Sequence, residues 1–99
     1  MLTPEIKEVI TQSAFIPIAT VSKDGQPHLI VVGKVKEIQG EDTLVFGVYK
    51  MVKTRQNLAE TGIMQAVAVV GKKGYRFSGK GTPGEKEVVL KVESVEPLL

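Results

Sequence analysis

Two lysines, a threonine and an arginine crowd one short stretch, GVYKMVKTRQNL at residues 47–58. Lys50, Lys53, Thr54 and Arg55 stand where an apolar, strand-like run gives way to a helical pattern. The first N–H groups of a helix have no partner inside it, and the helix dipole favours an anion there. A lysine ammonium and a hydroxyl beside such groups predict a phosphate site. The alternative is that Thr54 merely caps the helix while the Lys and Arg side chains point into water.

Two glycine motifs resemble nucleotide-binding sequences without meeting their requirements. Residues 47–54, GVYKMVKT, fall one letter short of a P-loop, because Val52 stands where that motif has glycine and no parallel strand–helix–strand unit surrounds it. Residues 79–84, GKGTPG, match G-x-G-x-x-G, but they lead into a strand rather than a helix. We therefore reject an NTPase site and interpret the second motif as a glycine-rich hairpin.

The remaining reactive side chains give little support to acid–base or metal chemistry. The single histidine, His28, has no partner that the sequence identifies, and we expect it at a solvated strand position. Four acidic residues fall in predicted turns, where acids are common: Asp24, Glu41, Asp42 and Glu85. We therefore name no catalytic acid or base and no metal ligand.

The elements that must position these residues are predicted in the order helix, three strands, helix, three strands. Thr3-Pro4-Glu5 provides the cap, the first position and an acid for an N-terminal helix. Asp24-Gly25 predicts a tight hairpin turn, and Gly62 ends the second helix, expected over 54–61. The strands are expected at 14–22, 28–38, 43–49, 64–71, 75–81 and 86–95.

Six mostly antiparallel strands in 99 residues are most economically closed into a barrel, because closure removes exposed sheet edges. We therefore predict a mainly-β fold, a six-stranded antiparallel barrel with two short helices, forming one domain over residues 1–99. Three aromatic side chains are expected in the barrel, where they could also edge a planar ligand: Tyr49, Tyr75 and Phe77.

The composition excludes several classes of protein. With 42% hydrophobic and 24% charged residues, the chain is of ordinary globular composition, and it has no apolar run long enough for a membrane span. The absence of cysteine excludes disulfides, thiolate metal sites and a cysteine nucleophile. The N-terminus does not read as a signal peptide, so we expect a soluble, cytoplasmic protein. A net charge of +2 is too weak to indicate a nucleic-acid partner.

Three segments, in order and with consistent spacing, resemble the pyridoxamine-5′-phosphate-oxidase-like family of FMN-binding split barrels, and most of all its very small flavin-binding members. IATVSKDGQPHLIVV (18–32) is similar to the family's first hairpin. LVFGVYKMVKTRQNL (44–58) is similar to its third strand, phosphate loop and helix, and YRFSGKGT (75–82) to its fifth strand. The resemblance spans residues 15–82, about two thirds of the chain.

The resemblance implies a split β-barrel with FMN in a cleft between two protomers of a homodimer. By position, Lys53 and Thr54 would hold the phosphate, joined by Arg55, through charge-assisted bonds of ~1.5–3 kcal/mol each. The backbone around Gly47 and Val48 would meet the polar edge of the isoalloxazine. Part of the second strand would lie along the ring and ribityl chain: Val31, Val32 and Gly33.

The implied function is electron transfer or simple flavin-dependent oxidoreduction, with the flavin carrying the redox chemistry. Relatives that oxidise pyridoxamine phosphate carry an Arg-x-His motif near a longer C-terminus, whereas this sequence ends in VEPLL, so we do not expect that activity. One alternative is a nucleic-acid-binding barrel of the OB type, against which stand the 5% aromatic content and the weak charge. Another is a flavin-free dimeric interaction module of the same family.

Overall fold

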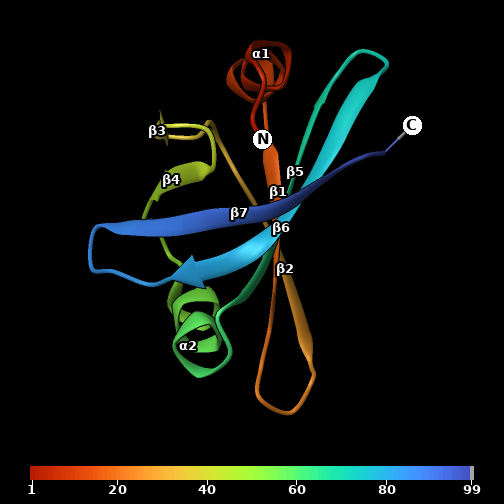
Figure 1. Cartoon of the computed structure of the whole chain (residues 1–99). Coiled ribbons are helices and arrows are strands. Elements are labelled where there is room, and N and C mark those ends of the chain that lie inside the picture. The colour runs from red at the N-terminus through yellow and green to blue at the C-terminus, as the bar shows by residue number, and fades with distance from the viewer. Residues whose placement is uncertain (99) are drawn as a thin grey trace.

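The structure, a computed structural model, describes residues 1–98, so the last residue of the predicted 1–99 domain lies outside the described range. Seven strands form one antiparallel sheet in the order β2-β1-β5-β6-β7-β4-β3, with two helices beside it (Figure 1). The elements are α1 (Pro4–Gln12), β1 (Ile16–Val21), β2 (Pro27–Val32), β3 (Glu37–Gln39), β4 (Thr43–Gly47), α2 (Val52–Glu60), β5 (Ile63–Val70), β6 (Lys73–Thr82) and β7 (Glu87–Pro97).

The expected closed, six-stranded barrel is wrong in two respects. The predicted strand 28–38 is two strands, because the chain bends over residues 33–36 and the Lys36 N–H donates to the Val45 carbonyl at 2.8 Å. β2 and β3 are the two ends of the sheet, and no strand pairing joins them in the described part of the chain. The mainly antiparallel β fold with two short helices is confirmed.

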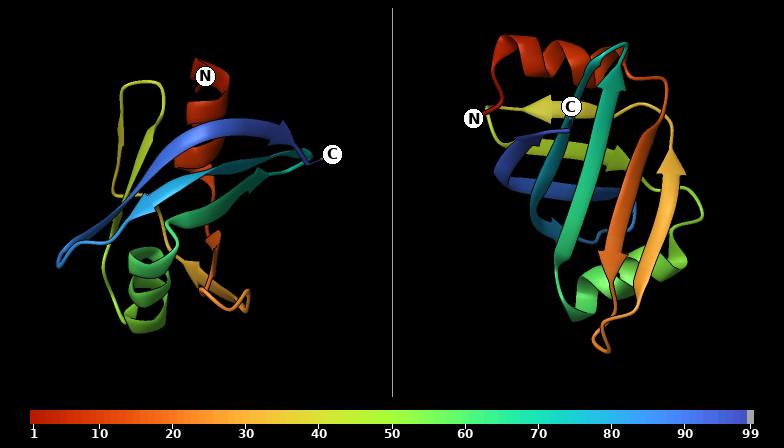
Figure 2. Two further views of the ribbon diagram at one scale, coloured as in Figure 1. Left: turned by 60° about the horizontal axis from the view of Figure 1, so that its bottom comes forward. Right: turned by 90° about the vertical axis from the view of Figure 1, so that its right-hand side faces the viewer.

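The two long strands β6 and β7 bend the sheet around a single core. Figure 2 shows β7 arching, so that the β3–β4 side turns toward the β1–β2 side. A register shift lies between Ser78 and Gly79, where a Cβ on the glycine would come within 1.9 Å of the Lys91 carbonyl oxygen. Gly79 belongs to GKGTPG, which ends β6 and turns into β7, so its interpretation as a hairpin is confirmed.

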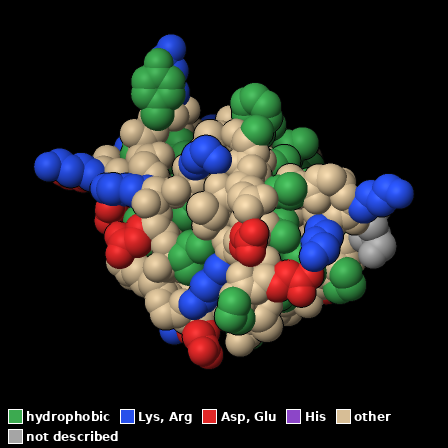
Figure 3. Space-filling view, turned by 90° about the horizontal axis from the view of Figure 1, so that it is seen from above, with side chains coloured by type: hydrophobic (Ala, Val, Ile, Leu, Met, Phe, Trp, Pro, Cys, Tyr) green, Lys and Arg blue, Asp and Glu red, His purple; other side chains and the backbone are tan. Residues whose placement is uncertain are grey.

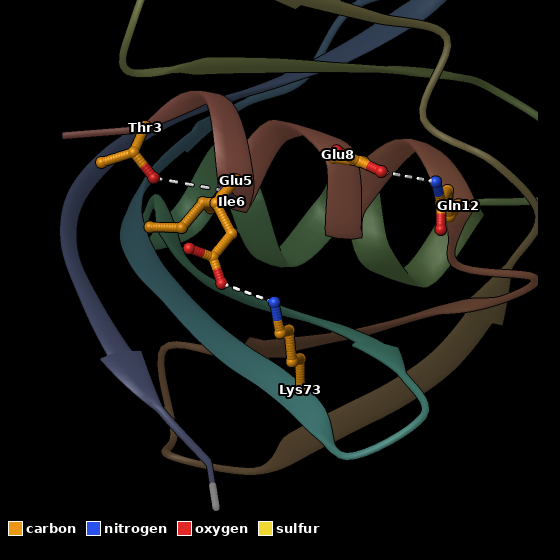
Figure 4. Close-up of polar contacts among 6 residues, drawn as sticks. All are labelled: Thr3, Glu5, Ile6, Glu8, Gln12 and Lys73. Carbon is orange, nitrogen blue, oxygen red and sulfur yellow. Dashed lines mark hydrogen bonds and ion pairs between the residues drawn. The ribbon is translucent and has the colours of Figure 1, made fainter.

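The first helix, α1, begins as the sequence predicts. The Thr3 hydroxyl accepts from the Ile6 N–H at 3.2 Å, and Pro4 stands at the first helical position (Figure 4). On the exposed side, Glu5 and Lys73 form an ion pair of 2.8 Å that joins α1 to β6. On the inner side, Val9 and Ile10 are buried in the core. α1 therefore covers one end of the sheet.

The second helix, α2, lies at the opposite end of the molecule from α1 (Figures 1 and 2). It begins two residues before the predicted start and ends before Gly62, whose φ of 70° suits glycine and whose N–H donates to the Leu58 carbonyl at 3.0 Å. α2 buries three side chains against the sheet: Thr54, Asn57 and Leu58. Neither helix is long and apolar enough to cross a membrane.

Candidate functional site

A groove of about 360 Å³ opens where β2 and β4 end. Its lining combines the end of β2 and the bend after it, within residues 31–36, with the end of β4 and the turn before α2, within residues 46–51. The lining residues are Val31, Val32, Gly33, Lys34, Lys36, Phe46, Gly47, Tyr49 and Met51. Its volume lies in the range of small-molecule sites in proteins. The structure therefore brings together two of the segments named from the sequence.

Four of the eight predicted cofactor residues line this groove: Val31, Val32, Gly33 and Gly47. Gly47 is exposed, and an added Cβ would meet nothing within 4 Å, so the backbone at the end of β4 is open to a ligand. Val48 is not among the lining residues. Its side chain packs against the core, and its N–H already donates to the Lys86 carbonyl at 3.0 Å.

The groove has an apolar floor and a basic side. Phe46 and Met51 are buried, which places apolar surface at the bottom. Lys36 donates to the Glu87 carboxylate at 2.6 Å, and this hydrogen bond raises the pKa of the lysine above its ordinary value. Lys34 donates to the Thr11 carbonyl at 3.0 Å. Such a groove suits a planar, largely apolar ring with some negative charge.

The predicted anion site lies next to this groove, at the N-terminus of α2. Met51 is the cap residue, and it makes no side-chain cap hydrogen bond, so no side chain satisfies the first N–H groups of the helix. The first turn contains no acidic residue. Because Met51 also lines the groove, the helix N-terminus and the groove share one residue.

The three predicted phosphate residues take three different positions. Lys53 is exposed on the first turn of α2. Thr54 is only 1% exposed, and its hydroxyl has no hydrogen-bond partner. Arg55 is half-buried, its Nε likewise without a partner, and it lines a separate open hollow beyond the helix. The interpretation of Thr54 as the helix cap is wrong, because α2 starts two residues earlier.

Sequence reasoning missed the contribution of the groove's basic side. Lys36 and Glu87 form a hydrogen bond although they are 51 positions apart in the sequence. The pairing of β4 with β7 brings them together. Among the aromatic side chains, Phe77 is buried and Tyr75 is half-buried, with 6.4 Å between their ring centroids. Tyr49, in contrast, is exposed and lines the groove. His28 lies on β2, a strand position as predicted, where it is half-buried, and it does not line the groove.

No group of three or more His, Asp or Glu residues in the range 1–98 could hold a metal ion. The groove offers apolar contact at the floor, lysine side chains at the rim and an uncapped helix N-terminus at one end. This combination fits an aromatic ring that carries an anionic group.

Several solved structures share the fold of this chain. HupZ from Group A Streptococcus is 22% identical, with 99% of this chain and 94% of that chain covered and a TM-score of 0.85. An FMN-binding protein from Syntrophomonas wolfei is 17% identical, with 93% and 82% covered and a TM-score of 0.77. HutZ, a heme storage protein from Vibrio cholerae, is 14% identical, with 97% and 94% covered and a TM-score of 0.72. These likenesses show a shared fold.

A search of curated protein sequences finds no match. The family model of pyridoxamine 5′-phosphate oxidase, in contrast, matches residues 2–95, which contain both helices and the whole groove. The resemblance seen in three sequence segments thus extends over nearly the entire chain. The chain belongs to the pyridoxamine 5′-phosphate oxidase family.

Proposed function

We propose that this protein binds FMN and acts in electron transfer or as a simple flavin-dependent oxidoreductase. We base the proposal on one juxtaposition: a ring-sized groove with an apolar floor adjoins an uncapped helix N-terminus through Met51. The family membership and the shared fold with an FMN-binding protein support a flavin as the ligand. When bound, FMN supplies the redox chemistry, while the protein supplies binding, orientation and charge.

The residues present fit the phosphate of FMN. The buried Thr54 hydroxyl and the Arg55 Nε, neither with a partner, lie in the first turn of α2. Buried polar groups are rarely left unsatisfied, so both atoms are available to a partner such as an ordered water or a phosphate oxygen. An anion at the N-terminus would be favoured by the helix dipole and by the exposed Lys53 ammonium. We assign the phosphate to this end and the ring to the groove, between Gly47 and Val31 to Gly33.

We further propose that the protein is a homodimer. The register pairs Ala19 with both Leu29 and Gln65, so one face of strands β2, β1 and β5 points away from the core. This outer sheet face carries exposed apolar side chains at Leu29, Val31, Ile63 and Val69. An exposed apolar face of adjacent strands is typical of a protein interface. Val31 belongs to both the face and the groove, so a partner seated here would border the flavin.

The first experiment is a visible absorption spectrum of the purified protein, before and after FMN is added and the unbound fraction removed. A retained flavin spectrum is expected, followed by an FMN titration of the Lys53→Ala variant. That variant should bind FMN more weakly by about 10-fold or more, because a charge-assisted bond of ~1.5–3 kcal/mol is lost. Lys72→Ala is the matched control, since Lys72 is an exposed lysine in a hollow beside α1, away from α2.

Other outcomes of the same experiment would point elsewhere. A colourless protein that does not retain added FMN would contradict the proposal and favour the flavin-free interaction module. Retention of heme in place of FMN would also contradict it, and the two cofactors differ clearly in absorption. Binding of single-stranded oligonucleotides that weakens with salt would favour the OB-type alternative. Figure 3 shows acidic and basic side chains interspersed on the face at the α1 end, which does not favour that alternative.

A further inference from the structure

We propose that Tyr49 covers the groove and stacks on the ring of the bound flavin, an inference that rests on the proposed function. The Tyr49 side chain is 77% exposed, yet it lines the groove together with the buried Phe46 and Met51. A ring that exposed gains little from the packing of its own chain. Its free face and its position suit contact with a ligand instead.

The backbone next to Tyr49 holds an unusual conformation. Lys50 has a φ of 53°, the only positive φ outside glycine among the described residues. This left-handed conformation is disfavoured for a residue with a Cβ, and such strain persists where the surrounding structure imposes it. The Lys50 ammonium lies 5.5 Å from the centre of the Tyr49 ring, within reach of a cation–π contact. The Tyr49 ring thus lies in the turn between β4 and α2, with the Lys50 ammonium beside it and the groove within its reach.

The β2 side of the groove offers a second apolar contact. Val31 lines the same groove from β2 and is also exposed. A planar ring placed between Tyr49 and this end of β2 would cover two exposed apolar side chains at once. The Tyr49 ring can stack on such a planar ring in the offset arrangement that aromatic pairs prefer. Stacking of this kind depends little on the substituents of the planar partner. The geometry therefore points to a ring held between the β4–α2 turn and β2.

The amino-acid composition makes this inference unusually easy to test. The chain has no tryptophan and only two tyrosines, Tyr49 and Tyr75. A tyrosine in contact with an excited flavin quenches its fluorescence, because the phenol donates one electron to the ring and then takes it back, leaving both unchanged. Phenylalanine stacks but does not donate. Tyr75 packs against the core on β6 and does not line the groove.

The experiment compares FMN affinity and bound-state fluorescence in the wild type and three variants. Tyr49→Phe should keep the affinity within about 3-fold and raise the fluorescence of bound FMN severalfold. Tyr49→Leu should raise the fluorescence and also raise Kd by roughly 5- to 140-fold, the range for removing an aromatic stacking platform. Tyr75→Phe is the control and should change neither. Circular dichroism checks that each variant is folded.

Each remaining outcome has a definite meaning. If wild-type protein binds FMN and both Tyr49 variants match it in Kd and fluorescence, the stacking role is overturned while the proposed function stands. Quenching that disappears in Tyr75→Phe alone would also overturn the stacking role. If wild-type protein does not bind FMN at all, both the proposed function and this inference are overturned.

Discussion

The Asn57 side-chain amide donates to the Thr20 hydroxyl at 3.2 Å and so joins α2 to β1 inside the core. Both side chains are completely buried, and the Asn57 carbonyl oxygen has no partner. The contact fixes the helix against the sheet one turn after Thr54, the residue whose hydroxyl is also unpartnered. The position of the proposed phosphate site therefore depends on a buried polar contact as well as on packing.

Replacement of Thr20 by Val should destabilise the protein by about 1–3 kcal/mol, because it leaves the Asn57 amide buried without an acceptor. The measurement is the free energy of unfolding from urea titration. The double variant Thr20→Val/Asn57→Leu should lose less than the single variant, since it removes both polar groups. A double variant that is less stable than Thr20→Val would contradict this account.

A side chain at Gly81 should destabilise the protein. A Cβ there would lie 2.6 Å from Leu58 Cδ2 and 2.8 Å from Met64 Sδ, so Gly81→Ala forces core side chains of α2 and β5 to shift. The expected loss is about 1–3 kcal/mol in the free energy of unfolding. Gly47→Ala is the control, because a Cβ there meets nothing within 4 Å, and its stability should stay within about 0.5 kcal/mol of wild type. Equal losses in both variants would disprove the packing explanation.

Asp42 should contribute to the acid sensitivity of the protein. Lys91 donates to its carboxylate at 2.8 Å, and with the Thr43 hydroxyl this lowers the pKa of Asp42 below its ordinary value of 3.8. A lowered pKa in the folded state stabilises the protein above pH 3.8, and this contribution is lost as the pH falls through the folded-state pKa. Wild type should therefore exceed Asp42→Asn in stability at neutral pH and converge with it as the pH falls through the folded-state pKa of Asp42.

The measurement is urea unfolding of wild type and Asp42→Asn over this pH range. Because the pair is exposed, the difference should be small and should shrink further in about 1 M salt. A difference that grows toward acidic pH would have the wrong sign for this mechanism.

Leu29→Glu should convert the proposed dimer into a monomer, because it places a charge on β2 within the exposed apolar face of β2, β1 and β5. Sedimentation velocity gives the oligomeric state. Val52→Glu is the matched control, since Val52 is 77% exposed but lies on α2. A wild-type protein that is already monomeric, or a dimer unaffected by Leu29→Glu, would rule out this face as the interface.

Local signals in the sequence predicted local structure well. Thr3 caps α1, Gly62 ends α2, and Gly25 takes the positive φ that the first hairpin turn needs, because each depends on residues a few positions away. The bend at 33–36 and the open sheet depend on pairing between distant strands, which apolar alternation does not encode.

The segments that form the candidate site were predicted, but the burial of individual side chains in it was not. Gly47 and residues 31–33 come together in one groove, as the resemblance to the family implied. The burial of Thr54 was missed, because a start of α2 at Val52 rather than Thr54 turns that side chain toward the core. The exposure of Tyr49 was also missed, since the left-handed Lys50 beside it is not a residue type that predicts such a conformation.

The bend over residues 33–36 trades sheet hydrogen bonds for an open ligand groove. Residues 33–36 belong to no strand, and three of these four positions line the groove: Gly33, Lys34 and Lys36. A substitution that straightened this segment and extended the ladder would add hydrogen bonds while it closed the opening. If only heat resistance were selected, we would therefore expect the groove to close before other parts of the fold changed.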